Sequence, residues 1–412
     1  MKGFRWLIMS LIFFAYILNF MDRSALSYVI EPLQKEFGLN NAEFGILYSA
    51  FGVSYLVMTI VGGLLVDRLG SRKILTLFSA LWSIVSGMMA IASGFFSILL
   101  IRIALGVAEG PAFPSLTRVC ADWLPHQERA RALAISLAAI PLASVIGAPF
   151  ISSLIVAFGW QLMFIALAIL GLIWSTVWYL IFRDHPQQSR FVSAEELHHI
   201  QENMPRTKKH IPLQAFLKYL SHQPQLITAY LAYFCLGYLL SFSVSWWPGY
   251  LNQTFQLDLK HIGWILCIPW LCVTVAILLG GSLSDKIWEK TQCIVKARFN
   301  LIIFCNICAG LAFIPLVLTH SLSIAITSIS LGLAFGLMPI APFYAINSDL
   351  ASEYAGTSQG LMSSCLGIAS FIAPALTGYL TQHSGNFNQA IIVIIILLFL
   401  AALGIQLEKN KK

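Results

Sequence analysis

The sequence predicts an all-α integral membrane protein with twelve transmembrane helices in two six-helix repeats and both termini in the cytoplasm. Three observations predict this fold: an apolar composition, a one-sided distribution of basic residues, and an internal duplication. Of the 412 residues, 58% are hydrophobic and 10% are charged, and the mean hydropathy is +0.79. Soluble proteins carry about 25% charged residues, so a soluble enzyme and a disordered chain are excluded. A nucleic-acid binder is excluded as well, because the net charge of +7 is spread over short loops.

Apolar stretches bounded by charged or turn residues give twelve candidate spans. Backbone polar groups in lipid must be satisfied within the segment, so each span is expected to be a helix of about 20 residues. The first stretch begins like a signal peptide, but Asp22 and Arg23 interrupt it and no small-residue cleavage site is evident, so we expect a retained helix. The approximate spans are 4–29, 42–66, 73–94, 96–121, 130–158, 160–182, 224–250, 261–284, 298–318, 322–348, 356–381 and 388–407.

The basic residues indicate the direction of the spans. With both termini inside, 21 of the 25 Lys and Arg residues fall on the inner side, and only Lys35 and Lys260 fall in outer loops. Arg23 and Arg102 lie within spans. Cytoplasmic loops of membrane proteins carry an excess of Lys and Arg, so the bias supports this orientation and an even number of spans. None of the eight cysteines falls in an outer loop, and no disulfide framework is expected.

The chain is an internal duplication. One span and both of its flanking loops match the sequence 218 residues later, and part of the fourth span matches the tenth in a register of 226. Two parallel repeats of this kind place a substrate between the halves, near the membrane midplane, with alternating access by rocking. The matching pairs include Gly62 with Gly280, Gly63 with Gly281, Leu65 with Leu283, Asp67 with Asp285, Gly106 with Gly332 and Gly110 with Gly336.

A polar stretch separates the repeats. We assign residues 1–183 to an N-terminal six-helix half, 184–223 to a cytoplasmic linker, and 224–412 to a C-terminal six-helix half. Ser193 and Glu196 form a capping-box pattern that predicts a short amphipathic helix in the linker. The histidines nearby lack a Cys or carboxylate at ligand spacing, so no metal site is expected.

Four unambiguous charges lie well inside the spans: Asp22, Arg23, Arg102 and Glu109. A charge at the bilayer centre costs about 2.5–3.5 kcal/mol on insertion scales, so each is a functional hypothesis. Arg102 and Glu109 are seven residues apart, or two helical turns, and share one helix face. Protonating either acid leaves this set with a net positive charge, which favours an anion. We therefore predict that Asp22 and Glu109 take up protons while Arg23 and Arg102 attract a carboxylate. Static ion pairs between the two helices are the alternative.

The polar loop after the second span predicts a conformational latch between the halves and not a substrate site. Gly70 permits a tight turn, and Asp67 can accept bonds from basic groups and helix N-termini. Pro111, Pro114 and Pro248 are expected to break or kink their helices. The predicted latch residues are Gly63, Asp67, Arg68, Gly70 and Arg72, with Asp285 and Asp349 in the same role.

Three motifs carry a resemblance to a known family. The loop from Gly63 to Lys73 matches the G-x-x-x-D-R-x-G-x-R/K signature of the major facilitator superfamily. Met21-Asp22-Arg23 and the block from Arg102 through Glu109-Gly110-Pro111 resemble, more narrowly, the anion:cation symporter family. Its bacterial members import sugar acids and other organic acids with protons, and they are related to vesicular glutamate and sialic acid transporters. The resemblance covers essentially the full length.

The resemblance implies roles for individual residues. It implies proton-linked groups at Asp22 and Glu109, and carboxylate binding and charge pairing at Arg23 and Arg102. Tyr55 falls where the family often has a cavity tyrosine. Tyr344 falls where it usually has a Trp, with Asn347 close by. The predicted substrate-binding residues are Arg23, Arg102, Tyr55, Tyr344 and Asn347.

Departures from the family pattern bear on the substrate. Phe20, Ala25, Thr59 and Val61 stand where the family often has Tyr, Asn, Gln and Pro. The loss of several hydrogen-bonding groups argues mildly against a polyhydroxylated sugar acid. It favours a more apolar or aromatic organic anion, or a larger conjugate such as a siderophore-like acid.

The leading hypothesis is a secondary active transporter that takes up an organic anion by proton symport. Proton-driven efflux of an organic anion or siderophore-like compound is the alternative, because the same acids could serve it. A transport-dead sensor would usually carry an added soluble domain, and an enzyme would need a convergent His, Ser or metal set at membrane depth. The expected partners are a small organic anion, the proton and the lipid bilayer, with no nucleic acid, metal or cofactor. A monomer in a bacterial inner membrane is expected.

Overall fold

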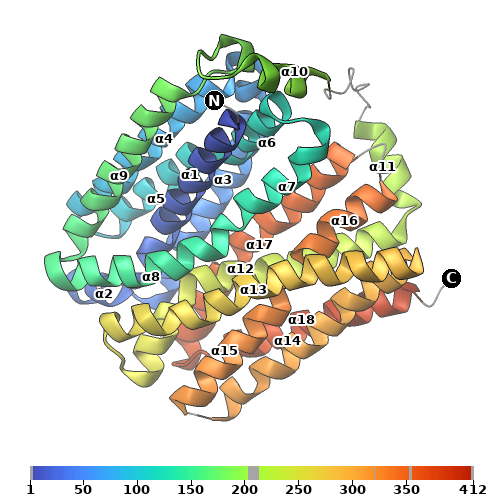
Figure 1. Ribbon diagram of the computed structural model, residues 1–412. Coiled ribbons are helices and arrows are strands. Elements are labelled where there is room, and N and C mark those ends of the chain that lie inside the picture. The colour runs from blue at the N-terminus through green and yellow to red at the C-terminus, as the bar shows by residue number, and fades with distance from the viewer. Residues whose placement is uncertain (1–2, 203–212, 320, 352–354, 410–412) are drawn as a thin grey trace. The chain divides into compact units, whose positions relative to one another are not determined.

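The computed structural model describes residues 3–202, 213–319, 321–351 and 355–409, and no strand occurs among them (Figure 1). Twelve helical segments of this part of the chain are long and apolar enough to cross a membrane. Six precede the linker and six follow it, so the predicted all-α fold with twelve spans is confirmed. The side of the membrane on which the termini lie stays a prediction.

Contacts between Cα atoms divide the chain into two compact units, each of which is described by itself. The first comprises Met1–Phe37 and Ala50–Lys209, and the second comprises Gly38–Ser49 and His210–Lys412. The second span therefore contributes its first turns to the second unit, whereas the repeat pattern assigns that span to the N-terminal half. Part of the predicted linker, residues 203–212, lies outside the described residues.

The first unit contains the first six spans and one helix of the linker. Within it α1 packs along α8 and α4 packs along α9. Its elements are α1 (Phe4–Tyr28), α2 (Ile30–Phe37), α3 (Asn41–Leu69, shared with the second unit), α4 (Ser71–Met88), η1 (Met89–Ile91), α5 (Phe95–Glu109), α6 (Ala112–Trp123), α7 (His126–Leu137), α8 (Ala139–Phe158), α9 (Trp160–Ile181), η2 (Pro186–Gln188) and α10 (Ala194–Glu202).

The second unit contains the remaining six spans. Within it α12 packs along α17, and α14 packs against both α15 and α18. Its elements are α11 (Leu213–Ser221), α12 (Pro224–Phe255), α13 (Leu259–Thr291), the π-helical turn η3 (Val295–Phe299), α14 (Asn300–Leu318), α15 (Leu322–Leu337), α16 (Ile340–Leu350), α17 (Ala355–Ser384) and α18 (Asn388–Lys409).

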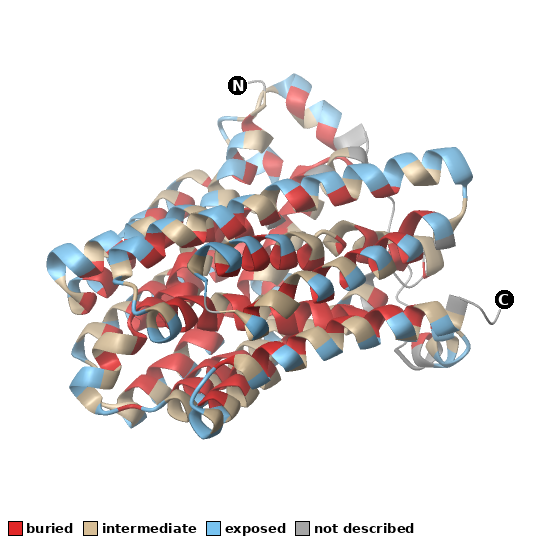
Figure 2. Cartoon of the chain, turned by 90° about the horizontal axis from the view of Figure 1, so that it is seen from below, coloured by how far each residue is buried: buried red, intermediate tan, exposed pale blue. Residues whose placement is uncertain are grey.

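Three predicted spans are interrupted in the structure. The fourth consists of α5 and α6, which are separated at Gly110–Pro111, as the proline pattern predicted. The tenth is divided at Met338–Pro339, and the fifth consists of α7 and α8. Helix α12, in contrast, continues through Pro248 without a break, and a kink at that residue stays a prediction. Figure 2 shows buried and exposed residues alternating along the helices, the pattern of helices with one packed face and one outer face.

Glycines allow α3 to approach α5 closely. A Cβ atom at Gly106 would lie 2.1 Å from the Ser54 hydroxyl and 2.5 Å from the Phe51 carbonyl oxygen, and one at Gly110 would lie 2.7 Å from the Met58 backbone. Glycines four residues apart are a recurrent device for close packing of membrane helices. This approach brings the α3 side chains onto α5, and it thereby sets the geometry of the charged interior.

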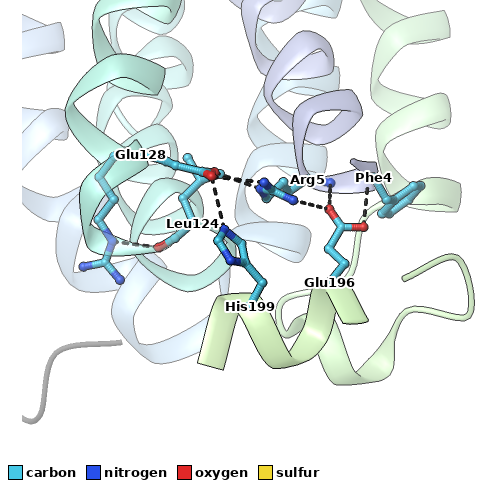
Figure 3. A network of polar contacts seen from close by, with 7 residues as sticks. Phe4, Arg5, Leu124, Glu128, Glu196 and His199 are labelled. Atoms are coloured by element: carbon cyan, nitrogen blue, oxygen red, sulfur yellow. Dashed lines mark hydrogen bonds and ion pairs between the residues drawn. The ribbon is translucent and has the colours of Figure 1, made fainter. Parts of the chain in front are cut away.

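The linker helix α10 is fastened to the start of α1 (Figure 3). Ser193 accepts a hydrogen bond from the Glu196 backbone, as the capping pattern predicted. The Glu196 carboxylate, however, accepts bonds from the backbone N–H groups of Phe4 and Arg5, both at 3.1 Å, and from the Arg5 guanidinium at 3.0 Å. Arg5 also donates to both oxygens of Glu128 in α7, at 2.8 and 3.0 Å. The Glu196 carboxylate of the linker helix therefore caps the N-terminus of α1.

Candidate functional site

Two neighbouring residues of α1 bring charge into the interior of the first unit. Successive residues of an α-helix point about 100° apart, so Asp22 and Arg23 face different neighbours. Asp22 faces Ser86 of α4, whereas Arg23 faces Glu109 at the last residue of α5. Three of the four predicted interior charges are buried, and the Arg23 side chain is 18% exposed.

Arg23 and Glu109 form a buried ion pair. The Arg23 Nε and Nη2 atoms donate to the same Glu109 oxygen, Oε2, at 3.1 and 2.8 Å. Nη2 also donates to the Asn19 amide oxygen at 3.3 Å. The other Glu109 oxygen, Oε1, is buried without a hydrogen-bond partner in the described part of the chain. A carboxylate with one paired and one unpaired oxygen can accept a proton without first losing its position.

Aromatic rings surround the Arg23 guanidinium. Its central carbon lies 4.6 Å from the ring centres of Phe20 and Tyr55 and 4.8 Å from that of Phe51. The guanidinium of Arg102 lies 4.8 Å from the same Phe51 ring. Cations are attracted to aromatic faces, most strongly where water is excluded. The rings therefore hold both arginines in place by their faces, while the edge of Arg23 donates to Glu109 and Asn19.

Asp22 is fully enclosed. It is 2% exposed, and the Ser86 hydroxyl donates to its Oδ1 at 2.7 Å. The structure thus brings Arg23, Tyr55, Arg102 and Glu109 together, while Asp22 lies on another side of α1. The Arg23–Glu109 pair joins the first and fourth spans, as the alternative of static ion pairs between the two helices described. The shared face of Arg102 and Glu109 did not by itself indicate which arginine Glu109 would meet.

Two predicted substrate-binding residues lie in the second unit. Tyr344 contacts Tyr233, with their hydroxyl oxygens 3.5 Å apart. Asn347 is buried at 2% exposure and is saturated with contacts. Its Oδ1 accepts from Ser358 at 2.6 Å and Tyr230 at 3.3 Å, and its Nδ2 donates to Gln359 at 3.0 Å. These contacts give Asn347 a structural role, and substrate binding at either residue stays a prediction.

The acidic residues assigned to the latch form ion pairs inside their own units. Asp67 pairs with Arg118 at 3.2 Å, and Arg118 also pairs with Asp122 at 2.7 Å. In the second unit Arg298 pairs with Asp285 at 2.8 Å and with Asp349 at 3.2 Å. The duplicated aspartates therefore meet an arginine in each unit. A latch between the halves stays a prediction.

The remaining latch residues surround the turn between α3 and α4. Gly70 has φ of +83°, and a Cβ atom there would lie 2.7 Å from the Asp184 carboxylate, so the turn requires glycine. Asp184 accepts from the Arg72 backbone at 2.8 Å, and the Arg72 side chain stacks on Tyr179 at 4.4 Å. A Cβ atom at Gly63 would lie 4.0 Å from the Cβ atom of Pro114. The Arg68 side chain is exposed.

The sequence did not indicate three residues of this site. They are Asn19, Phe51 and Ser86. Each is an ordinary residue of a membrane helix, so no sequence signal separates it from its neighbours. Among the described residues, no group of three His, Cys, Asp or Glu side chains is arranged to hold a metal ion.

Comparison with known proteins decides the family. The family model described as Major Facilitator Superfamily matches residues 12–374. The chain belongs to the Major Facilitator Superfamily. Members of this superfamily are transporters, so the predicted family and the prediction of transport rather than catalysis are confirmed. A structure of a bacterial homolog to the human lysosomal transporter Spinster, inward-facing and unoccupied, has a TM-score of 0.79 at 17% identity, with 99% of this chain and 97% of that chain covered. That likeness shows the fold.

Superfamily members with named substrates are similar over nearly the full length. The hexuronate transporter of Bacillus subtilis is 30% identical, with 93% of this chain and 89% of that protein covered. The probable galactarate/D-glucarate transporter GudP of the same species is 31% identical, with 95% and 88% covered. The probable sulfoacetate transporter SauU of Cupriavidus necator is 29% identical, with 97% and 93% covered. All three names specify organic anions, in agreement with the predicted family.

Proposed function

We propose that the protein is a proton-coupled symporter that takes up a small organic anion by alternating access. The observation that carries the proposal is the buried pair of Arg23 and Glu109, in which Glu109 Oε1 has no hydrogen-bond partner in the described part of the chain. Arg102 adds a second positive charge and contacts the Phe51 ring that Arg23 also contacts. A proton and an anion can therefore be bound at one place.

Binding of the proton and binding of the anion are coupled through the charge of Glu109. While Glu109 is ionised, it neutralises Arg23 and occupies two of its N–H donors. A proton on Oε1 makes Glu109 neutral and weakens the ion pair, and those donors become free for a carboxylate or sulfonate. Loss of the anion restores the preference of Glu109 for Arg23 and favours release of the proton. Binding of each load then raises the affinity for the other, as linkage requires.

The substrate class follows from the site together with the relatives. Hexuronate, galactarate, glucarate and sulfoacetate are the substrates in the relatives' names, and all carry a carboxylate or sulfonate on a small molecule. The edges of two arginines suit such a group. Phenyl faces at Phe20 and Phe51 beside Arg23 favour an anion with fewer hydroxyl groups than a sugar acid.

The test uses purified protein in liposomes that contain a pH-sensitive dye. Glucuronate, galactarate, glucarate, sulfoacetate and aromatic carboxylates are added outside, one at a time. We expect at least one of them to acidify the lumen, with empty liposomes as the control. Uptake of a radiolabelled anion without acidification would contradict symport, and silence across the panel would contradict the substrate class.

We also propose an inner-membrane location with both termini in the cytoplasm. The proposal is supported by the distribution of basic residues, 21 of 25 on one side of the predicted topology. Cysteines introduced at Lys35 and at Arg190 test the orientation, because the topology places them on opposite sides. A membrane-impermeant thiol reagent applied to intact cells should label the first site and not the second.

A further inference from the structure

We infer that Ser86 is a positioning residue for the proton site at Asp22, and that its hydroxyl sets the pH at which this carboxylate takes up a proton. The inference rests on the proposed proton coupling and adds a residue of a third helix to it. Ser86 touches neither the arginines nor the anion site in any described contact. Its role is exerted through Asp22 alone.

The hydrogen bond between Ser86 and Asp22 is short and buried. Ser86 Oγ donates to Asp22 Oδ1 at 2.7 Å, and the two residues are 1% and 2% exposed. A buried carboxylate is stabilised in its charged form by each hydrogen bond that it accepts and is destabilised by the absence of water. Among the described contacts, the Ser86 hydroxyl is the side-chain group that donates a hydrogen bond to Asp22. Removing that one donor therefore acts on the charged form of Asp22 specifically.

The surroundings of Asp22 leave few other groups to set its protonation. Helices α8 and α9, which pack on α1, carry no Asp, Glu, Lys, Arg or His, and neither does α4 from Ile74 onward. Glu109, which is paired with Arg23, acts on Asp22 through its charge, and Arg102 lies on Phe51. Among the described charged side chains of α6 and α7, Glu128 pairs with Arg5, and Arg118 pairs with Asp67 and Asp122. The charged residues of α2, beyond the other end of α1, are Glu31 and Lys35, paired together, and Glu36, bonded to Trp160.

Helix α4 supplies its own control residues. Ser79, Ser83 and Ser86 are all buried on one face of the helix. Ser79 and Ser83 donate to backbone carbonyls one turn earlier, at 3.1 and 2.8 Å, which is the usual bond of a serine in a membrane helix. Ser86 instead donates to a side chain of another helix. A role specific to Asp22 should therefore appear at Ser86 and be absent at Ser83.

The bond links proton uptake to helix movement. In the ionised state, Asp22 holds α1 to the last turn of α4. A proton on Asp22 removes the charge that makes this hydrogen bond strong, so the α1–α4 contact weakens as the proton binds. Helix α4 leads through η1 and a three-residue connection, residues 92–94, into α5, which carries Arg102 and Glu109. Protonation of Asp22 thereby changes the constraints on α5, the helix that carries Arg102 and Glu109.

The experiment compares the wild type with Ser86→Ala, Ser86→Thr, Ser86→Cys and Ser83→Ala in detergent and in liposomes. The first readout is the infrared carbonyl band of protonated carboxyl groups, titrated with pH without substrate, with the Asp22 contribution identified by its loss in Asp22→Asn. We expect Ser86→Ala to move the midpoint of this band upward by roughly one pH unit, a tenfold change in the protonation equilibrium. Ser86→Thr and Ser83→Ala should keep the wild-type midpoint.

The second readout is the pH profile of uptake in liposomes, with glucuronate and sulfoacetate as probes. The pH of half-maximal uptake should rise in Ser86→Ala by the same amount, with Ser86→Cys in between because a thiol is a weaker donor. An unchanged midpoint of the Asp22 band in Ser86→Ala and Ser86→Cys overturns the inference, as does an equal shift in Ser83→Ala. Anion transport without proton movement overturns the proposed function, whereas the substrate-free band still decides the role of Ser86.

Discussion

The two units bury different polar chemistry. The interior of the first contains a buried ion pair, Arg23 with Glu109, and a carboxylate, Asp22, bonded to a hydroxyl. The second unit buries Arg298, which pairs with Asp285 and Asp349. Its cluster around Asn347, by contrast, consists of neutral groups that bond to one another, with Asn347 between Ser358 and Gln359. In the register of 226, Glu109 corresponds to Phe335 and Arg102 to Ser328. The interior charges of the first unit therefore have neutral counterparts in the second.

One duplicated fold can therefore hold a titratable ion pair in one unit and a neutral hydrogen-bond network in the other. A charged pair changes its interactions when a proton binds, because one pairing partner becomes neutral. A neutral amide and hydroxyl network does not change within the physiological pH range, since its members do not titrate there. We therefore expect substitutions in the first unit to alter coupling and substitutions in the second to alter stability.

The largest effect is expected for Glu109→Gln. Gln keeps the shape of the side chain but cannot ionise, so Arg23 stays available in every state and proton binding no longer matters. Accumulation against a gradient should be lost while exchange of labelled for unlabelled anion continues. The measurement is uptake in liposomes with and without an imposed pH gradient.

The matched control is Glu31→Gln, which removes a carboxylate from a more exposed pair with Lys35. It should accumulate the anion as the wild type does. Gradient-driven accumulation by Glu109→Gln at the wild-type level would remove Glu109 from the coupling mechanism and erase the contrast between the units.

Arg23→Lys should have the next largest effect. Lysine keeps the charge but lacks the planar group that bonds twice to Glu109 and stacks on three rings. The apparent affinity for the anion should fall about tenfold, which corresponds to about 1.4 kcal/mol. Concentration dependence of uptake measures this change.

Arg190→Lys is the control, because Arg190 is an exposed arginine that also lies on a phenylalanine, at 5.2 Å. Its affinity should match the wild type. An unchanged affinity in Arg23→Lys would mean that a point charge suffices and that the aromatic surroundings of Arg23 do not shape the site.

Most of the fold could be predicted from the sequence, because lipid imposes it. A run of apolar residues has few alternatives to a helix in a membrane, and eleven of the twelve predicted spans begin within a few residues of the observed ones. The fifth did not, because α7 is polar at its start and joins α8 without a turn residue that marks the boundary. Pro248 shows the converse, since α12 accommodates it within a continuous helix.

The candidate site could be predicted only in part. Charges inside apolar spans are rare enough to identify Asp22, Arg23, Arg102 and Glu109 individually. Their pairing depends on how far each helix is rotated, and that is decided by contacts such as those of Gly106 with α3. Ser86 could not be predicted, because Ser79 and Ser83 on the same face of α4 look alike in the sequence.

Asn347→Ala tests the second unit. Loss of this side chain removes bonds from Tyr230, Ser358 and Gln359 in a buried region. A buried polar group left unsatisfied costs about 1–3 kcal/mol, so the unfolding temperature in detergent should fall clearly. The anion affinity of the protein that remains folded should change little. Asn386→Ala, in an exposed position, is the control for stability. A loss of affinity without a loss of stability would assign Asn347 to the substrate and make the two units alike.

Glu128→Gln should have the smallest effect, and only in one pH range. Hydrogen bonds from Arg5 lower the pKa of Glu128 below its ordinary value of 4.5, with a further contribution from His199. The stabilisation is therefore present above that ordinary value and is lost as the pH falls through the lower pKa of the folded protein. At about pH 7 the variant should be less stable by about 1 kcal/mol, the upper end for a partly exposed ion pair. The difference should shrink as thermal unfolding is measured at successively lower pH. A difference that stays constant down to strongly acidic pH would show that the Arg5–Glu128 pair does not fasten the linker side of the first unit.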